Sequence, residues 1–250
     1  KKKKWEELQF FFDRGMKTPE LRNDAELEQI HWSTNRTGTW PEMRVFAFDH
    51  RMQLEDLADE LKVTRDRIGP FKELCLRAAR TVSGDKAGYG ILCDRRLGRD
   101  ALYAAAGTEL WIGRPVEVPG SRPLQLEIGP DLGTKLAEWP VEHVVKVLCF
   151  YHPDDDAQTK TDQEETIVRL ADAARANGLE FLLEVIPSKV RDCDDETTAK
   201  VIERFYDIGV YPDWWKLEPM KSDGAWRNTC DAIAKNDPYC RGIVVLGLEG

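Results

Sequence analysis

The sequence has no apolar run that approaches the roughly 18 residues a membrane-spanning helix needs, and no signal peptide opens it. Its 250 residues carry a net charge of −9, so the basic surface expected of a nucleic-acid-binding protein is missing. Charged residues make up 32% of the chain and hydrophobic residues 42%, which is typical of a folded soluble protein. We therefore expect a cytoplasmic protein that binds neither a membrane nor a nucleic acid.

Cysteine and histidine form no recognisable metal-binding motif. The six cysteines contain no C-x-x-C pair, and the four histidines are scattered along the chain. His50 and His152 each have an acidic residue nearby, Asp49 and Asp154, which keeps a metal-dependent lyase open as an alternative. No spacing singles out a metal site, so we expect neither a metal nor another cofactor.

A glycine-rich phosphate loop is also missing after the first predicted strand, which argues against a dinucleotide-binding or P-loop domain. Apolar runs instead alternate with helical patterns, at intervals long enough for the crossovers between parallel strands. The predicted strands cover residues 44–48, 89–93, 110–116, 144–151, 181–186, 214–218 and 242–248. The predicted helices cover residues 70–82, 99–106, 134–138, 162–177, 195–208 and 223–235.

This succession of β-α units predicts an α/β protein with a TIM (β/α)8-type barrel, and a doubly wound open sheet is the alternative. Seven strands are evident, so the eighth β/α unit is missing from this chain, or the C-terminus is truncated or disordered. We expect residues 1–40 to form a lead-in with a short helix, suggested by Trp5, Leu8, Phe11 and Phe12. Residues 41–250 are then the barrel domain.

Three predicted strands carry an ionisable residue inside an apolar run: Lys146, Glu184 and Lys216. A buried charge costs several kcal/mol unless it is paired or neutralised. A single strand lysine more often points outward to solvent, but three such cases together favour a shared site. Strand alternation permits all three side chains to face inward, with Glu184 on the strand between the two lysines. The pattern predicts a Lys-Lys-Glu cluster.

Such a cluster suits chemistry on a carbonyl group. A lysine amine attacks a ketone only when neutral, and its ordinary pKa of about 10.4 leaves it protonated near neutral pH. Burial and a neighbouring ammonium both lower that pKa, so we expect Lys146 to lower the pKa of Lys216. Glu184 would carry protons while the carbinolamine loses water. The protonated imine then accepts the electrons of a breaking carbon–carbon bond.

Other candidates lie at or near the carboxyl ends of the strands, where barrel enzymes place their active sites. Asp49 could deprotonate a substrate hydroxyl, or it could simply cap the next helix. Arginine is suited to phosphate and carboxylate because its planar guanidinium binds in a bidentate manner. The candidates for substrate binding are Arg51, Arg95, Arg96, Arg114, Tyr151, His50 and Glu218. For Arg95 and Arg96, next to Asp94, a solvated surface cluster is the alternative.

The segments that hold the charges resemble strands of the class I tagatose-1,6-bisphosphate aldolases. The similarity covers residues 146–151, 181–184 and 215–219, and residues 49–51 resemble the Asp-Gln-Arg of the first strand in that family. It implies a Schiff base on the lysine at position 216. His50 stands where that family has glutamine, and Tyr-His-Pro-Asp at 151–154 replaces its Tyr-Tyr-Asp, so contacts to substrate hydroxyls do not transfer.

A second resemblance covers nearly the whole chain from Phe11 onward, and concerns the C-terminal domain fused to 5-dehydro-2-deoxygluconokinase in bacterial inositol catabolism (IolC). It is carried by residues 46–51, 90–98, 111–120 and 214–220. It implies a class I aldolase, a lyase that cleaves 2-deoxy-5-keto-D-gluconate 6-phosphate to dihydroxyacetone phosphate and malonate semialdehyde. It also implies a carbohydrate kinase domain fused on the N-terminal side. The alternative is a non-catalytic sugar-phosphate-binding domain that serves the kinase. The oligomeric state, a homo-oligomer included, stays open.

Overall fold

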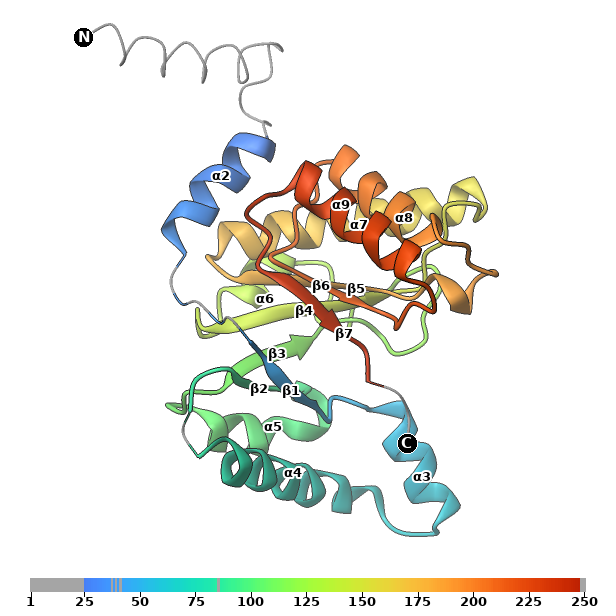
Figure 1. Ribbon diagram of the computed structural model, residues 1–250. Coiled ribbons are helices and arrows are strands. Elements are labelled where there is room, and N and C mark those ends of the chain that lie inside the picture. Colours follow the sequence, from blue (N-terminus) through green and yellow to red (C-terminus); the bar gives the residue numbers. More distant parts are fainter. Residues whose placement is uncertain (1–24, 37, 39, 41, 85, 248–250) are drawn as a thin grey trace, which may run out of the picture.

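The computed structural model describes residues 25–36, 38, 40, 42–84 and 86–247 (Figure 1). Within these residues, seven parallel strands form one sheet in chain order. The sheet curls like the wall of a barrel, and β1 and β7 are its two edges. The strands are β1 (Arg44–Ala47), β2 (Tyr89–Leu92), β3 (Trp111–Pro115), β4 (His143–Cys149), β5 (Glu180–Val185), β6 (Trp214–Leu217) and β7 (Gly242–Val245).

Helices cover the outer side of this sheet in two groups, which Figure 1 shows below and above it. The lower group consists of α4 (Ile68–Ser83) and α5 (Arg95–Ala105), which pack outside β1 to β3. The upper group consists of α7 (Ala157–Ala176), α8 (Thr197–Asp207) and α9 (Asp223–Asn236), outside β4 to β6. The remaining helical elements are α2 (Ala25–Asn35), α3 (Met52–Glu60), α6 (Leu132–Leu136) and the short 3-10 turns η2 (Arg65–Arg67) and η3 (Pro187–Lys189).

Local sequence signals explain where several helices begin and end. The side chains of Asp94, Asp156 and Ser222 cap α5, α7 and α9 by accepting a hydrogen bond from the backbone N–H three residues later. Gly178 and Gly209, with φ of 68° and 84°, follow α7 and α8 in the left-handed conformation that glycine adopts without steric cost. After each of these helix ends the chain reverses direction and leads into the next strand.

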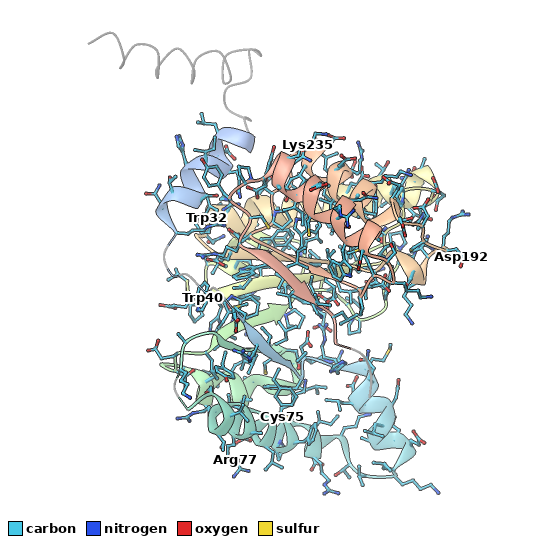
Figure 2. All side chains as sticks on the ribbon, in the orientation of Figure 1. Trp32, Trp40, Cys75, Arg77, Asp192 and Lys235 are labelled. Carbon is cyan, nitrogen blue, oxygen red and sulfur yellow. The ribbon has the colours of Figure 1, made fainter. Side chains whose placement is uncertain are left out.

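Tryptophans close the interior of the curl at the amino ends of the strands. The ring of Trp214 lies 6.1 Å from that of Trp40 and 5.7 Å from that of Trp111, measured between centroids. Gly90 makes room for Trp111, because a Cβ there would lie 2.7 Å from the Trp111 backbone oxygen. Figure 2 shows Trp40 on the side of the molecule opposite Asp192, which follows β5. Further along the strands, buried polar side chains take the place of these rings, as Lys216 does after Trp214 in β6.

The predicted α/β barrel class is confirmed. All seven predicted strands are present, with bounds within three residues of those predicted. Among the described residues β1 and β7 do not pair with each other, which is consistent with a missing eighth unit. No helix of the described part of the chain is long and apolar enough to cross a membrane.

Two helices, α2 and α3, were not predicted. The sequence of α2 has only a weak apolar period. The α3 helix is short, at 9 residues, and largely polar. The starts of α5 and α7 were predicted four and five residues too late, since their first turns are mostly polar. The short helix predicted around Trp5 to Phe12 lies outside the described residues.

Candidate active site

Lys146, Glu184 and Lys216 meet inside the curl, as the sequence predicts. Glu184 lies between the two lysines and offers one carboxylate oxygen to each. Its Oε1 lies 2.8 Å from Lys216 Nζ, and its Oε2 lies 2.9 Å from Lys146 Nζ. All three residues are buried. The cluster is therefore a pair of amines bridged by a single carboxylate.

Two further carboxylates surround Lys146. Its Nζ lies 3.2 Å from Oε1 of Glu117 and 3.5 Å from Oδ2 of Asp49. Burial alone would lower the pKa of Lys146, but the charges of Glu117, Glu184 and Asp49 outweigh it and hold that pKa above its ordinary value. Lys146 is thus a fixed cation at neutral pH.

Glu117 follows β3 and was not among the sequence-based candidates. Its Oε1 also accepts a hydrogen bond from Arg51 Nη2 at 2.7 Å, and its Oε2 accepts one from the backbone N–H of Leu148 at 3.1 Å. The alternation of side chains between the two faces of a strand could have identified it. Glu117 is an odd-numbered residue like Gly113 and Pro115, so it points to the same inner face of the sheet. Glu117 joins the loop after β3 to the lysine cluster.

Asp49 lies just beyond β1 and is buried. Burial alone would raise the pKa of Asp49, but the charges of Lys146 and Lys216 together lower it below its ordinary value of 3.8. Asp49 is therefore ionised at neutral pH, as a carboxylate that accepts protons must be.

We expect Asp49→Asn to reduce the acid sensitivity of the fold. A carboxyl whose pKa is lowered by folding contributes stability above its unfolded pKa, and this contribution is lost as the pH falls through the folded pKa. The wild-type protein should therefore lose more free energy of unfolding than Asp49→Asn when the pH falls from about 5 to about 3. Urea unfolding of both proteins at both pH values measures the difference. An equal loss would show that Asp49 does not interact with the lysines.

A buried lysine of α4 holds the backbone on both sides of Asp49. Lys72 Nζ donates hydrogen bonds to the backbone oxygens of Phe48, at 2.8 Å, and His50, at 2.9 Å, and it pairs with Asp94. Its side chain is fully buried. Lys72 was not predicted, since nothing in an amphipathic helix marks which lysine turns inward. It fixes the end of β1 and hence the direction of the Asp49 side chain.

The predicted arginines do not form one anion site. Arg51 is buried, and its Nη1 donates hydrogen bonds to the backbone oxygen of Glu117, at 2.7 Å, and to Glu127 Oε2, at 2.9 Å. Arg96 also pairs with Glu127, at 3.5 Å, and with Glu55. These two arginines bind the loop after β3 next to the cluster.

Arg95 and Arg114 lie away from the cluster. Arg95 is 62% exposed, and its Nη1 lies 3.8 Å from Glu138. Arg114 alternates with Gly113 and Pro115 and so points to the outer side of β3, where its guanidinium lies 3.7 Å from the centre of the Trp139 ring. Neither residue therefore lies at the lysine cluster, where the sequence predicts the substrate.

Tyr151 and Glu218 have hydrogen-bond partners other than the two lysines. Tyr151 packs outside the sheet against Phe205, with ring centroids 5.0 Å apart, and its hydroxyl donates to Glu164 Oε1 at 2.5 Å. His50 is exposed, and Glu218 accepts hydrogen bonds from the backbone N–H of Ser188, at 3.2 Å, and from its hydroxyl.

His152, the other histidine considered for a metal, is buried, and its Nε2 lies 3.3 Å from the backbone oxygen of Asp192. Within the described residues no group of three or more His, Cys, Asp or Glu side chains is placed to hold a metal ion.

Tyr151→Phe tests whether Tyr151 is structural. The variant keeps the packing against Phe205 and removes the hydrogen bond to Glu164, so we expect a loss of about 1 kcal/mol in the free energy of unfolding. We expect unchanged kcat and KM, because the hydroxyl lies outside the curl. Chemical unfolding and steady-state kinetics measure the two effects, and a large loss of kcat with intact stability would return Tyr151 to the substrate site.

Comparisons with known proteins place the chain in a sequence family and a fold. Residues 7–250 match the family described as "Uncharacterized protein conserved in bacteria (DUF2090)". No curated protein matches the sequence.

Solved structures that share the fold include two at 12% sequence identity. One is the fructose-bisphosphate aldolase of Plasmodium falciparum, described in a ternary complex with TRAP and a small-molecule inhibitor. It is 12% identical, with a TM-score of 0.57 over 89% of this chain and 75% of that one. The other is Cgl0159 of Corynebacterium glutamicum, 12% identical, with a TM-score of 0.53 over 89% of this chain and 85% of that one. At this identity the similarity establishes a shared fold.

Proposed function

This chain belongs to the DUF2090 family, and we propose that it is a class I aldolase, a lyase that cleaves a carbon–carbon bond through a Schiff base on Lys216. The observation that carries the proposal is the buried carboxylate of Glu184 between two amines, 2.8 Å from Lys216 Nζ and 2.9 Å from Lys146 Nζ. The cluster lies inside a curled parallel sheet toward its carboxyl edge, where barrel enzymes act.

Lys216 is the nucleophile because its surroundings differ from those of Lys146. Three carboxylates lie within 3.5 Å of Lys146 Nζ and hold it as an ammonium, which cannot attack a carbonyl. Among the described residues Lys216 forms an ion pair with Glu184 alone, and its proton can pass to that carboxylate directly. The neutral amine then adds to a ketone, Glu184 returns the proton to the carbinolamine hydroxyl, and water leaves to give the protonated imine.

Within this reaction class we propose the substrate 2-deoxy-5-keto-D-gluconate 6-phosphate, on the resemblance of residues 90–98 and 111–120 to the domain of inositol catabolism. The imine forms at C5. Asp49 accepts the proton of the C3 hydroxyl, the C3–C4 bond breaks, and its electrons move to the iminium as an enamine. C3 becomes the aldehyde of malonate semialdehyde. Protonation of the enamine at C4 and hydrolysis of the imine release dihydroxyacetone phosphate and Lys216.

Lys146 and the arginines complete the proposed site. The Lys146 ammonium faces the position where oxygen carries negative charge, at the carbinolamine and at the C3 oxygen. Arg96 is the candidate for the phosphate, since its side chain is 43% exposed and it shares Glu127 with Arg51 at the edge of the cluster. We propose that the domain works in the cytoplasm next to a carbohydrate kinase domain that supplies the phosphorylated keto acid.

Borohydride trapping tests the assignment. Sodium borohydride added with 2-deoxy-5-keto-D-gluconate 6-phosphate should reduce the imine to a stable secondary amine. The peptide that contains Lys216 should then be heavier by the mass of the attached ketone. Lys146→Met should still give the adduct on Lys216 if it folds, because Lys146 is not the nucleophile. Calorimetry that detects binding of the substrate without an adduct or turnover would identify a non-catalytic binding domain instead.

A further inference from the structure

A cavity lies on the outer side of the sheet beside β3, on the face turned away from the lysine cluster. Its volume is about 700 Å³, within the range of small-molecule sites. One wall is α5, and the opposite wall is the segment that leads from α6 into β4. We call this cavity the outer pocket. Both Arg95 and Arg114, which the sequence analysis assigned to an anion, line it.

Arg114 is a buried guanidinium without an acidic partner. Its Nη1 lies 3.4 Å from His143 Nδ1, and its buried Nε has no hydrogen-bond partner. No carboxylate of the described residues pairs with it in the outer pocket or elsewhere. Burial, with a contribution from the nearby Arg95, lowers the pKa of Arg114 to about 10, so it is still a cation at neutral pH. A buried charge of this kind destabilises the protein until a counter-charge reaches it.

The surroundings of Arg114 do not supply that counter-charge. Burial, and then the charge of Arg114, lower the pKa of His143 to about 4, so the histidine is neutral. The glutamates of the pocket are at its exposed rim, where Glu138 is already shared between Arg95, at 3.8 Å, and Lys135, at 3.6 Å. The deep end is therefore positive.

The walls near Arg114 are largely apolar. The Trp139 ring lies against one face of the guanidinium, 3.7 Å away, and Leu102 and Ile112 also line the pocket. A ligand that fits must combine a negative group at the deep end with an apolar body along these walls. Arginine favours planar or tetrahedral oxyanions, which it binds through two parallel hydrogen bonds.

We propose that the outer pocket binds a small oxyanion carried on an apolar body, with Arg114 as its anchor. Carboxylates and phosphate monoesters share this chemistry. Because Arg114 points outward from β3 while Gly113 and Pro115 point inward, such a ligand lies on the opposite side of β3 from a substrate on Lys216. It can bind at the same time as the substrate.

Calorimetry with three phenyl compounds tests the proposal. Phenyl phosphate and benzoate carry the two oxyanions, and benzyl alcohol is the neutral control. We expect one or both anions to bind the wild-type protein at concentrations up to about 10 mM and benzyl alcohol not to bind. The stronger of the two anions identifies the preferred group. Absence of binding by both anions, or equal binding of benzyl alcohol, would overturn the proposal.

Variants locate the site. Arg114→Gln should weaken anion binding at least about tenfold, whereas Arg175→Gln should leave it unchanged. Arg175 is a matched control, because its guanidinium is stacked on Trp32 at 4.4 Å outside the outer pocket. Ala106→Asp places a negative charge on an exposed position of the pocket wall and should also weaken binding. If Arg114→Gln does not fold, the anion affinity of Ala106→Asp alone shows whether the anion binds in the outer pocket. Unchanged affinity in Ala106→Asp and in a folded Arg114→Gln would refute the assignment.

Discussion

Lys216→Met should lower kcat by about a thousandfold or more and abolish the borohydride adduct. Methionine has nearly the length of lysine and no nucleophilic nitrogen, so it fills the space but cannot form an imine. Glu184 keeps its contact with Lys146 Nζ at 2.9 Å, so one of the two ion pairs of the cluster survives. Single-turnover kinetics and mass spectrometry after borohydride reduction measure the two losses.

Lys216→Arg is the matched control for this experiment. Arginine keeps a positive charge next to Glu184 and so retains the ion pair, yet its guanidinium does not deprotonate to attack a ketone. We expect stability close to that of the wild-type protein together with the same loss of kcat. A variant at Lys216 that keeps more than about a tenth of the wild-type kcat would contradict the Schiff-base assignment.

Glu117→Gln should be the most destabilising single change in the cluster, with a loss of about 3 to 5 kcal/mol in the free energy of unfolding. The Glu117 carboxylate contacts Arg51 Nη2 at 2.7 Å and Lys146 Nζ at 3.2 Å, and it accepts the backbone N–H of Leu148. Glutamine has almost the same shape but no charge, so two buried cations each lose a counter-ion. Urea unfolding of the two proteins at neutral pH measures the loss.

Glu127→Gln provides the comparison, since Glu127 also pairs with Arg51, at 2.9 Å, but is more exposed. Its side chain is 23% exposed, against 5% for Glu117, and solvent screens its charge. We expect a loss of about 1 kcal/mol or less. Equal losses in the two variants would mean that Glu117 is no more than an ordinary partner of Arg51.

The sequence predicts the strands and the buried charges because both depend on local patterns. Apolar runs of strand length recur between helical segments. The charged residues at 146, 184 and 216 interrupt these runs at positions whose side chains point to the inner face of the sheet. Lys72 could not be predicted in this way. It reaches the end of β1 from a helix of the outer layer, and only the packing of α4 against the sheet decides that contact.

The position of a residue along a strand and the face of the sheet to which it points are independent, and the predicted site residues share mainly the first. Tyr151 and Arg114 lie near the carboxyl ends of their strands, as predicted. In β4 the inward residues have even numbers, such as Lys146, so Tyr151 lies outside. In β3 they have odd numbers, such as Trp111, so Arg114 faces the helices. The same parity rule would have added Glu117.

In the proposed reaction, Glu184 faces the Lys216 ammonium before the substrate binds, and it faces a positive charge again once the protonated imine has formed. The sign of the charge at this nitrogen is thus the same in the resting protein and in the covalent intermediate. The counter-ions that folding fixes around an ammonium are already oriented for an iminium, so the reorganisation energy of the step is small. Engineering that replaces these ion pairs with apolar residues to raise stability would remove this electrostatic preorganisation with them.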